Sequence, residues 1–324
     1  MSRQSKMSSA KVLYVNISGV SSEVMKNLIL AGIRGAIADG RPYPDALAET
    51  PTSFLPPHER EREHERTIDS VEDSSDEPQK KRLKKMSVAK AMQPHVLELN
   101  PLLEECEINE EDLSSIPAEY FANFDIVIAS NIGLDQAIRI SKATAAADAK
   151  FYLVHSFGFH ACAMIDLGGG HTFRRETGKD KLSDVKKIDP YTSLEKMADV
   201  KLIDAKDRWH KHGNPPKIFA KYRTLLNYYE KKGGFPSDSS AEDFVILAKE
   251  FLKEQGLEDD YLGGDAELKQ LANTGTAEIA PVCAAMGGVI GNEVLKAISG
   301  KGEPANNLLL FNGTDGGCSA FTLK

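Results

Sequence analysis

The sequence predicts an α/β protein with a doubly wound, mostly parallel sheet. Short runs of aliphatic and β-branched residues alternate along most of the chain with longer segments whose apolar residues recur at helical spacing. This alternation is typical of parallel strands joined by crossover helices. Its clearest instance is the stretch 11–39, which reads as strand, helix and strand and ends in Asp39.

The stretch 11–39 is expected to form a βαβ unit. Its first strand is rich in β-branched and aliphatic residues, and its helix carries apolar residues on one face. Ser21 or Ser22 is the expected N-cap of that helix, and Gly32 its expected end. The strand, the helix and the second strand are predicted at 12–17, 23–31 and 33–38.

A βαβ unit that ends in an acid is typical of Rossmann-like nucleotide-binding folds. The phosphates contact free amides at the helix N-terminus, and the acid binds the ribose hydroxyls. The glycine fingerprint G-x-G-x-x-G would fall on three residues that are not glycine, Asn16, Ser18 and Ser21. Gly19 and Asp39 are therefore the candidate nucleotide-binding residues. The missing glycines favour a vestigial site, and the alternative is a loosened site that still binds.

The remaining elements extend the same domain, which covers residues 1–324. They are a helix at 87–99, a strand at 102–108, a helix at 112–124, a strand at 125–129, a helix at 135–149 and a strand at 150–154. Residues 190–276 contain successive helical segments separated by glycine and proline, which indicates a helical insertion. Residues 277–324 add a long helix and a hairpin with strands at 306–311 and 318–323.

A charged segment interrupts this pattern at residues 57–86. It has almost no large apolar residues, so we expect a disordered insert. Its last part resembles a nuclear localisation signal with five basic residues, Lys80, Lys81, Arg82, Lys84 and Lys85. This cluster predicts a protein that is nuclear and also cytoplasmic.

The totals exclude several classes of protein. The chain has 324 residues, 41% of them hydrophobic, a net charge of −8 and a pI of about 5.6. The acidic balance argues against a nucleic-acid partner bound through overall charge. No uninterrupted apolar run reaches the length of about 18 residues typical of a membrane span, and the N-terminus lacks an apolar signal core. We therefore expect an intracellular, soluble protein without a membrane partner.

The cysteines and histidines show no spacing typical of a metal site. Free thiols are expected for all four cysteines, Cys106, Cys162, Cys283 and Cys318. A catalytic role is the alternative for two of these, Cys162 and Cys283, but neither lies in an evident electropositive turn. Structural or surface roles are expected for the three neighbouring histidines, His155, His160 and His171. No catalytic residue and no metal ligand is assigned.

Two blocks of the sequence resemble a known family. The first is VLYVNISGVSSEVMKNLILAGI at 12–33, and the second is APVCAAMGGVIGNEVLKAISGK at 280–301, followed by NNLLLFNG. Both resemble the smaller, non-catalytic subunit of the heterodimeric SUMO-activating enzyme, in the ubiquitin-activating-type adenylation-domain family. The resemblance implies an adenylation-type fold and a larger catalytic partner subunit. That partner would bind ATP and Mg²⁺, adenylate the C-terminus of SUMO and carry the modifier as a thioester, whereas this chain would bind no cofactor alone.

The chain departs from the family pattern in two places. The segment Y-D-R-Q-I-R-L-W-G, whose arginine reaches the partner's nucleotide site, is missing before Gln4, and Arg3 is not assigned that role. Either the sequence begins late or the arginine has been lost. The N-x-x-R-x-Q pattern of active adenylation domains is also missing after Asp39.

The C-terminal helix carries three close glycines, Gly287, Gly288 and Gly291. They allow close backbone approach, either to the sheet or to a partner subunit, and both interpretations are compatible. Three other functions stay open from the sequence: a homodimeric adenylating enzyme of the same fold, an oxidoreductase that binds NAD at the same unit, and a stand-alone nucleotide-binding scaffold.

Overall fold

The computed structural model describes residues 3–43, 45–47, 50–51, 86–178, 181–205 and 213–324. Except for Met86, the predicted disordered insert lies outside the described residues, and so does the whole basic cluster at 80–85. Both therefore stay predictions.

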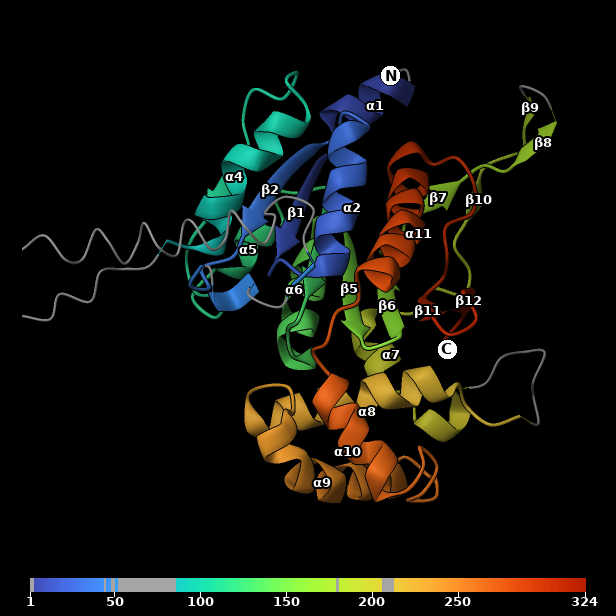
Figure 1. The fold of residues 1–324 in the computed structure, drawn as a ribbon. Coiled ribbons are helices and arrows are strands. Elements are labelled where there is room, and N and C mark those ends of the chain that lie inside the picture. Colours follow the sequence, from blue (N-terminus) through green and yellow to red (C-terminus); the bar gives the residue numbers. More distant parts are fainter. Residues whose placement is uncertain (1–2, 44, 48–49, 52–85, 179–180, 206–212) are drawn as a thin grey trace, which may run out of the picture.

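An eight-stranded mixed sheet forms the centre of the molecule, in the order β12-β11-β6-β5-β4-β1-β2-β3 (Figure 1). Five neighbouring strands are parallel, and the three at the other edge alternate in direction. The predicted doubly wound, mostly parallel fold is confirmed. The strands are β1 Lys11–Val15, β2 Arg34–Ala38, β3 Glu107–Asn109, β4 Ile126–Ser130, β5 Lys150–Phe157, β6 His160–Asp166, β11 Leu308–Asn312 and β12 Gly317–Phe321.

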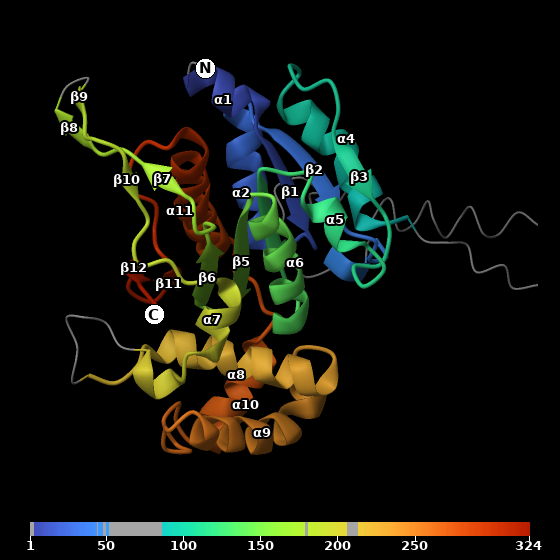
Figure 2. The ribbon, with the colours of Figure 1, turned by 180° about the vertical axis from the view of Figure 1, so that it is seen from behind.

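Helices cover both faces of this sheet. On one face lie α1 (Arg3–Ser9), α2 (Gly19–Leu30), α4 (Val88–Leu99) and α11 (Ala280–Ser299). On the other lie α5 (Ala118–Phe121), α6 (Leu134–Ala146) and α7 (Leu194–Asp199), as the reverse view in Figure 2 shows. Three further helices, α8 (Lys217–Lys232), α9 (Ala241–Glu254) and α10 (Asp265–Thr274), form a helical unit that contacts the sheet through α8.

The strand side chains alternate between two apolar cores. Val12 and Tyr14 of β1 pack with α2, α4 and α11, whereas Leu13 and Val15 pack on the side of α6 and the helical unit. A central parallel strand is buried on both faces, so its sequence is apolar without interruption. This is why the aliphatic runs predicted the central strands well.

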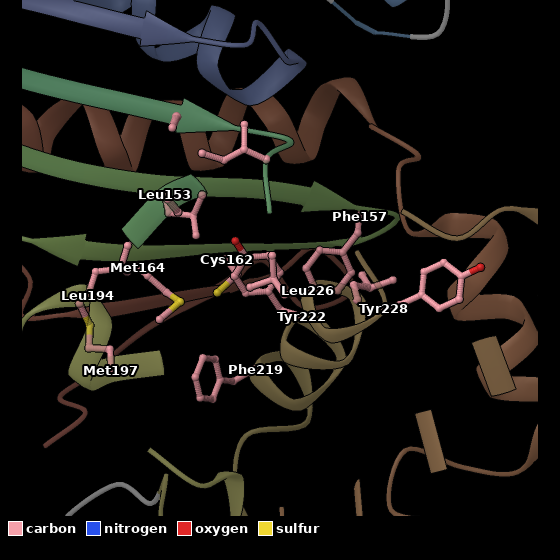
Figure 3. Close-up of a cluster of buried hydrophobic side chains, with 14 of the residues drawn as sticks. Leu153, Phe157, Cys162, Met164, Leu194, Met197, Phe219, Tyr222, Leu226 and Tyr228 are labelled. Carbon is pink, nitrogen blue, oxygen red and sulfur yellow. The ribbon is translucent and has the colours of Figure 1, made fainter. Parts of the chain in front are cut away.

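The second core joins the sheet to the helical unit (Figure 3). Cys162 of β6 points into this cluster, between Met164 and the ring of Tyr222 from α8. The side chains of Phe157 and Phe219 belong to the same cluster. The helical unit is therefore fixed to the sheet by buried apolar contacts.

Three local predictions were wrong. The strand predicted at 102–108 is only the short β3, because the Leu102 amide donates to Oδ1 of Asn100 in a turn where the strand was expected to begin. Helix α2 begins at Gly19 with Ser18 as its N-cap, earlier than the predicted caps at 21 and 22, because Ser18 accepts a hydrogen bond from the Ser21 amide. The predicted helix at 112–124 is reduced to α5. Asp112 accepts from the Ser114 amide in a local turn, which competes with helix formation there.

Helix α11 alone among the described helices combines the length and mean hydropathy of a membrane span. It includes two charged residues, Glu293 and Lys296, so it contains no uninterrupted apolar run of that length. Half of its most apolar window is buried inside this fold, where the helix crosses α2 and the sheet.

Candidate functional site

The candidate site lies at the carboxyl edge of the sheet, where β1 and β4 are neighbours. The chain leaves β1 towards β2 on one side and later returns to β4 on the other, so the connections diverge at this point. In open α/β sheets such a divergence is where ligands bind. The N-termini of α2 and α6, which follow β1 and β4, flank the position.

The turn after β1 contains Asn16, Ser18 and Ser21 at the three positions of the glycine fingerprint. Asn16 has a positive φ of 54°, a conformation that asparagine tolerates better than most residues. Ser18 and Ser21 form a reciprocal capping box: the Ser18 amide donates to the Ser21 hydroxyl at 2.8 Å, and the Ser21 amide donates to the Ser18 hydroxyl at 3.1 Å. Two of the amides that a phosphate would need are therefore already bound.

The other two amides of the first turn of α2 point to a carboxylate. The Gly19 amide donates to Oε2 of Glu278 at 2.8 Å, and the Val20 amide also donates a hydrogen bond to this carboxylate. A helix leaves four N-terminal amides without an intrahelical partner, and in α2 the chain itself provides an acceptor for all four. Burial raises the pKa of the Glu278 carboxyl, and the two amides oppose this shift.

The space beside Gly19 is also occupied. A Cβ atom at this position would lie 2.9 Å from Sγ of Cys283 and 3.0 Å from Cγ of Pro51. In a phosphate loop, glycine makes room for the ligand. Here Gly19 makes room for Cys283 and Pro51, so a phosphate does not fit beside it.

Asp39, the predicted ribose-binding acid, is bound by the chain as well. Its carboxylate accepts from the Ile17 amide at 2.7 Å and forms an ion pair with Arg41, whose Nε and a terminal nitrogen donate at 2.9 and 2.6 Å. The Asp39 side chain is fully buried, and that of Arg41 is 30% exposed. Burial lowers the pKa of the Arg41 guanidinium, but the hydrogen bonds to Asp39 and its negative charge outweigh this effect. The pKa of Arg41 therefore lies above its ordinary value.

A second carboxylate caps the neighbouring helix. Glu230, near the end of α8, accepts from the Asp135 amide of α6 at 3.3 Å, and burial raises the pKa of its carboxyl. A Cβ atom on Gly133, the N-cap of α6, would lie 2.6 Å from the ring of Tyr229. The end of α8 therefore sits directly on the turn after β4.

His155 attaches the segment that carries Glu278 to the sheet. Its two ring nitrogens lie 2.8 Å from Oδ1 of Asn131 and 2.8 Å from the carbonyl oxygen of Gly275. The Gly158 amide donates to the Ala277 carbonyl at 2.7 Å in the same crossing. Burial lowers the pKa of His155 to about 4, so its imidazole is neutral and structural at neutral pH.

The predicted cysteine and histidine roles can be compared with this geometry. Cys162 lies in the apolar core, and burial raises its pKa well above the ordinary value. Burial and the charge of Glu278 raise the pKa of Cys283 to about 12, so both thiols stay protonated and unreactive. All four cysteines are free, Cys318 alone being exposed. In the part of the chain that the structure describes, no three His, Cys, Asp or Glu side chains converge as metal ligands.

The three glycines of α11 face different ways. Gly287 is buried against Glu23 of α2, and Gly291 is buried against Asn27 of the same helix. Gly288 is exposed, with no atom within 4 Å of a Cβ built on it. Two of the three therefore serve packing within this chain, and contact with a partner remains a prediction for Gly288.

Sequence reasoning missed the three residues that fill the site, Arg41, Glu230 and Glu278. Arg41 follows Asp39 by two positions in a proline-rich stretch, and this proximity was its only signal. The two glutamates come from segments about 100 and 260 positions away from the amides that they bind. No local pattern reveals such contacts.

Several curated proteins to which this chain is similar are SUMO-activating enzyme subunits. Subunit 1 from Xenopus tropicalis is 26% identical over 96% of this chain and 88% of its own length. Subunit 1 from Danio rerio is 26% identical over 97% of this chain, and that from Homo sapiens is 24% identical over 97%, each aligned over 88% of its own length. No protein-family model matches the sequence. These similarities cover the sheet, the helical unit and the C-terminal hairpin together.

Proposed function

We propose that this chain, a homologue of subunit 1 of SUMO-activating enzymes along nearly its whole length, is the subunit of such an enzyme that does not bind its nucleotide. It would pair with a larger catalytic subunit as a heterodimer. That partner would bind ATP and Mg²⁺, adenylate the C-terminus of SUMO and carry SUMO as a thioester. The basic cluster at 80–85 supports a nuclear location, with a cytoplasmic fraction as well.

One observation carries this proposal: in the described part of the chain, the α2 amides and the acid with which the fold would bind a nucleotide already have partners. Gly19 and Val20 direct their amides to Glu278, and Asp39 is bound by Arg41. A triphosphate would have to displace a carboxylate from the α2 N-terminus and then lie close to it. Like charges at short range in a poorly hydrated site are strongly unfavourable.

The second helix terminus supports the same proposal. The Glu230 carboxylate of α8 contacts the first turn of α6, on the other side of the divergence point from Glu278. Both carboxylates approach from the helical unit or from the segment that follows it. These contacts support the proposal that ATP binds to the partner subunit and not to this site.

Binding measurements test the nucleotide assignment. Isothermal titration of Mg·ATP would be carried out on the isolated chain, the isolated larger subunit of the same organism and their complex. We expect no heat of binding for this chain up to millimolar nucleotide, and binding by the complex. Titratable ATP binding by the chain alone would refute the proposal and favour a homodimeric adenylating enzyme.

A thioester assay tests the subunit assignment. SUMO, ATP and the larger subunit would be incubated with and without this chain, and the thioester separated on a non-reducing gel. We expect thioester formation only when both subunits are present. Failure of the two chains to associate would refute the proposed pairing, and the chain would then be a scaffold without a role in activation.

A further inference from the structure

A β-hairpin arm at residues 172–187 projects from the body of the protein (Figures 1 and 2). Its base is the pair β7 (Thr172–Phe173) and β10 (Lys186–Lys187), and its outer part is the pair β8 (Glu176–Gly178) and β9 (Lys181–Leu182). Both pairs are antiparallel. None of the site geometry described above involves this arm.

The base of the arm is fixed to the turn that follows α11. The Arg174 amide donates to the Gly300 carbonyl at 2.9 Å, and the Gly302 amide donates to the Arg174 carbonyl at 2.9 Å. Phe173 is buried at the same level. The direction of the arm is therefore determined by the C-terminal end of α11.

Beyond its base, the arm contacts the rest of the described chain through two ion pairs, made by Arg175 and Glu176 near its start. From Arg174 to Lys187, every described residue except Leu182 and Ser183 is exposed, and the apolar side chain of Val185 is 54% exposed. The arm keeps its shape through its backbone, since the Ser183 amide donates to the Arg175 carbonyl at 2.8 Å. A projection whose described residues are mostly exposed leaves surface that a partner can reach.

The charge of the arm is opposite to that of the chain. Residues 172–187 contain six basic and three acidic residues, a net charge of +3 in a chain of net charge −8. Arg175 forms an ion pair with Glu303, and Glu176 with Lys301. Among the described residues, none pairs with the ammonium groups of three exposed lysines, Lys181, Lys186 and Lys187.

We infer that this arm binds an acidic surface of the larger subunit and clasps it against α11. The inference rests on the proposed heterodimer. The arm starts at the end of α11, and the exposed side of α11 carries a row of small residues, Ala284, Ala285 and Gly288. A partner seated on that row would lie within reach of the arm, and basic side chains with no intramolecular partner attract an acidic surface. Nucleic acid is the weaker match, because the chain as a whole repels it.

Charge reversal in the full-length chain tests the inference. The variant K181E/K186E/K187E would be compared with the control K90E/K201E/K231E, which reverses three lysines that are exposed elsewhere on the surface. The dissociation constant of each from the larger subunit would be measured at 50 and 300 mM salt. We expect the affinity of the arm variant for the larger subunit to fall about tenfold or more at low salt, mainly through a slower association rate. Its affinity should also depend less on salt than that of the wild type. The control variant should bind as the wild type does.

The outcomes separate the arm from the heterodimer itself. If the wild type binds and the arm variant binds equally well, the arm inference is refuted while the proposed heterodimer stands. If the wild type does not bind the larger subunit, the heterodimer itself fails. Tight binding of a 20-base-pair duplex by the wild type that the arm variant loses would overturn the inference in favour of a nucleic-acid partner. A circular dichroism spectrum of each variant checks that the fold is retained.

Discussion

Gly287 and Gly288 are adjacent residues of α11 for which the structure predicts opposite effects of alanine. A Cβ atom on Gly287 would lie 2.5 Å from Cβ of Glu23 and 3.3 Å from the backbone nitrogen of Val24. Contacts this short force α2 and α11 apart, because the atoms nearest to the added Cβ include backbone atoms of α2, which cannot rotate away. A Cβ atom on Gly288 would have no neighbour within 4 Å.

The magnitudes follow from two terms. Replacing glycine by alanine inside a helix gains about 1 kcal/mol of helix propensity at either position. Overpacking a tight contact costs about 1–3 kcal/mol, and only Gly287→Ala incurs this cost. Since the propensity term is common to both variants, their difference in unfolding free energy isolates the overpacking term. We expect Gly288→Ala to be stabilising by up to about 1 kcal/mol and Gly287→Ala to be less stable than it by about 1–3 kcal/mol.

Urea unfolding followed by circular dichroism at 222 nm measures this difference. Both variants would be compared with the wild type under one set of conditions, so that their midpoints and slopes can be compared directly. Equal midpoints for the two variants would refute the close crossing of α2 and α11. A lower unfolding midpoint for Gly288→Ala alone would show that the outward side of α11 is packed in the free chain.

Three further predictions concern the site. Arg41→Ala should cost about 3 kcal/mol in urea unfolding, because it leaves the buried Asp39 carboxylate without its cation, and adding Asp39→Asn should recover part of this loss; no recovery would contradict the pair. Gly19→Ala should cost about 1–3 kcal/mol, and adding Cys283→Ala should relieve it; a thermal shift that the second substitution does not reduce would contradict the contact. Since the pKa of His155 falls from 6.5 to about 4 on folding, the folded chain binds fewer protons, and the stabilisation is present above pH 6.5 and lost as pH falls towards 4. The stability advantage over His155→Gln should therefore shrink by about 3 kcal/mol over this range, and a constant difference would contradict the buried neutral imidazole.

Local pattern was sufficient for the central sheet. The strand around Tyr14 and the strand around Ile128 are apolar without interruption, and each is buried on both faces. Their burial is a property of a continuous segment, so the sequence of that segment predicts it. The closing hairpin at Leu308–Asn312 and Gly317–Phe321 was predicted for a similar reason, since two apolar runs flank a glycine-rich turn.

Helix ends were predicted less well, because they depend on single hydrogen bonds. The sequence predicted Ser21 or Ser22 as the N-cap of α2 and left Ser18 in the preceding turn. The structure selects Ser18, because a helix that starts there lets Ser21 complete the capping box. The segment 112–124 has helical spacing, but the turn at Asp112 and the proline at 117 leave only its last part helical.

The worn glycine fingerprint was visible in the sequence, but its structural consequence was not. Missing glycines alone leave two states open: a loop whose amides are free but poorly shaped, or a loop whose amides are bound elsewhere. The choice depends on Glu278, which reaches Gly19 from a crossing segment held by His155. Only the tertiary fold brings these residues together.

Ser18, Ser21 and Glu278 together provide the hydrogen-bond acceptors that the N-terminus of α2 needs. A buried helix N-terminus without a ligand must satisfy four amides, and leaving any of them unbound costs roughly 1–3 kcal/mol. In a nucleotide-binding protein of this fold the phosphates meet part of this need, whereas in this chain the acceptors come from its own side chains. Ser18 and Ser21 supply two, and Glu278 supplies the negative charge that the helix terminus favours. The serines in place of the fingerprint glycines and the carboxylate of Glu278 therefore act together: they satisfy the N-terminal amides of α2 and connect α2 to the segment that follows the helical unit.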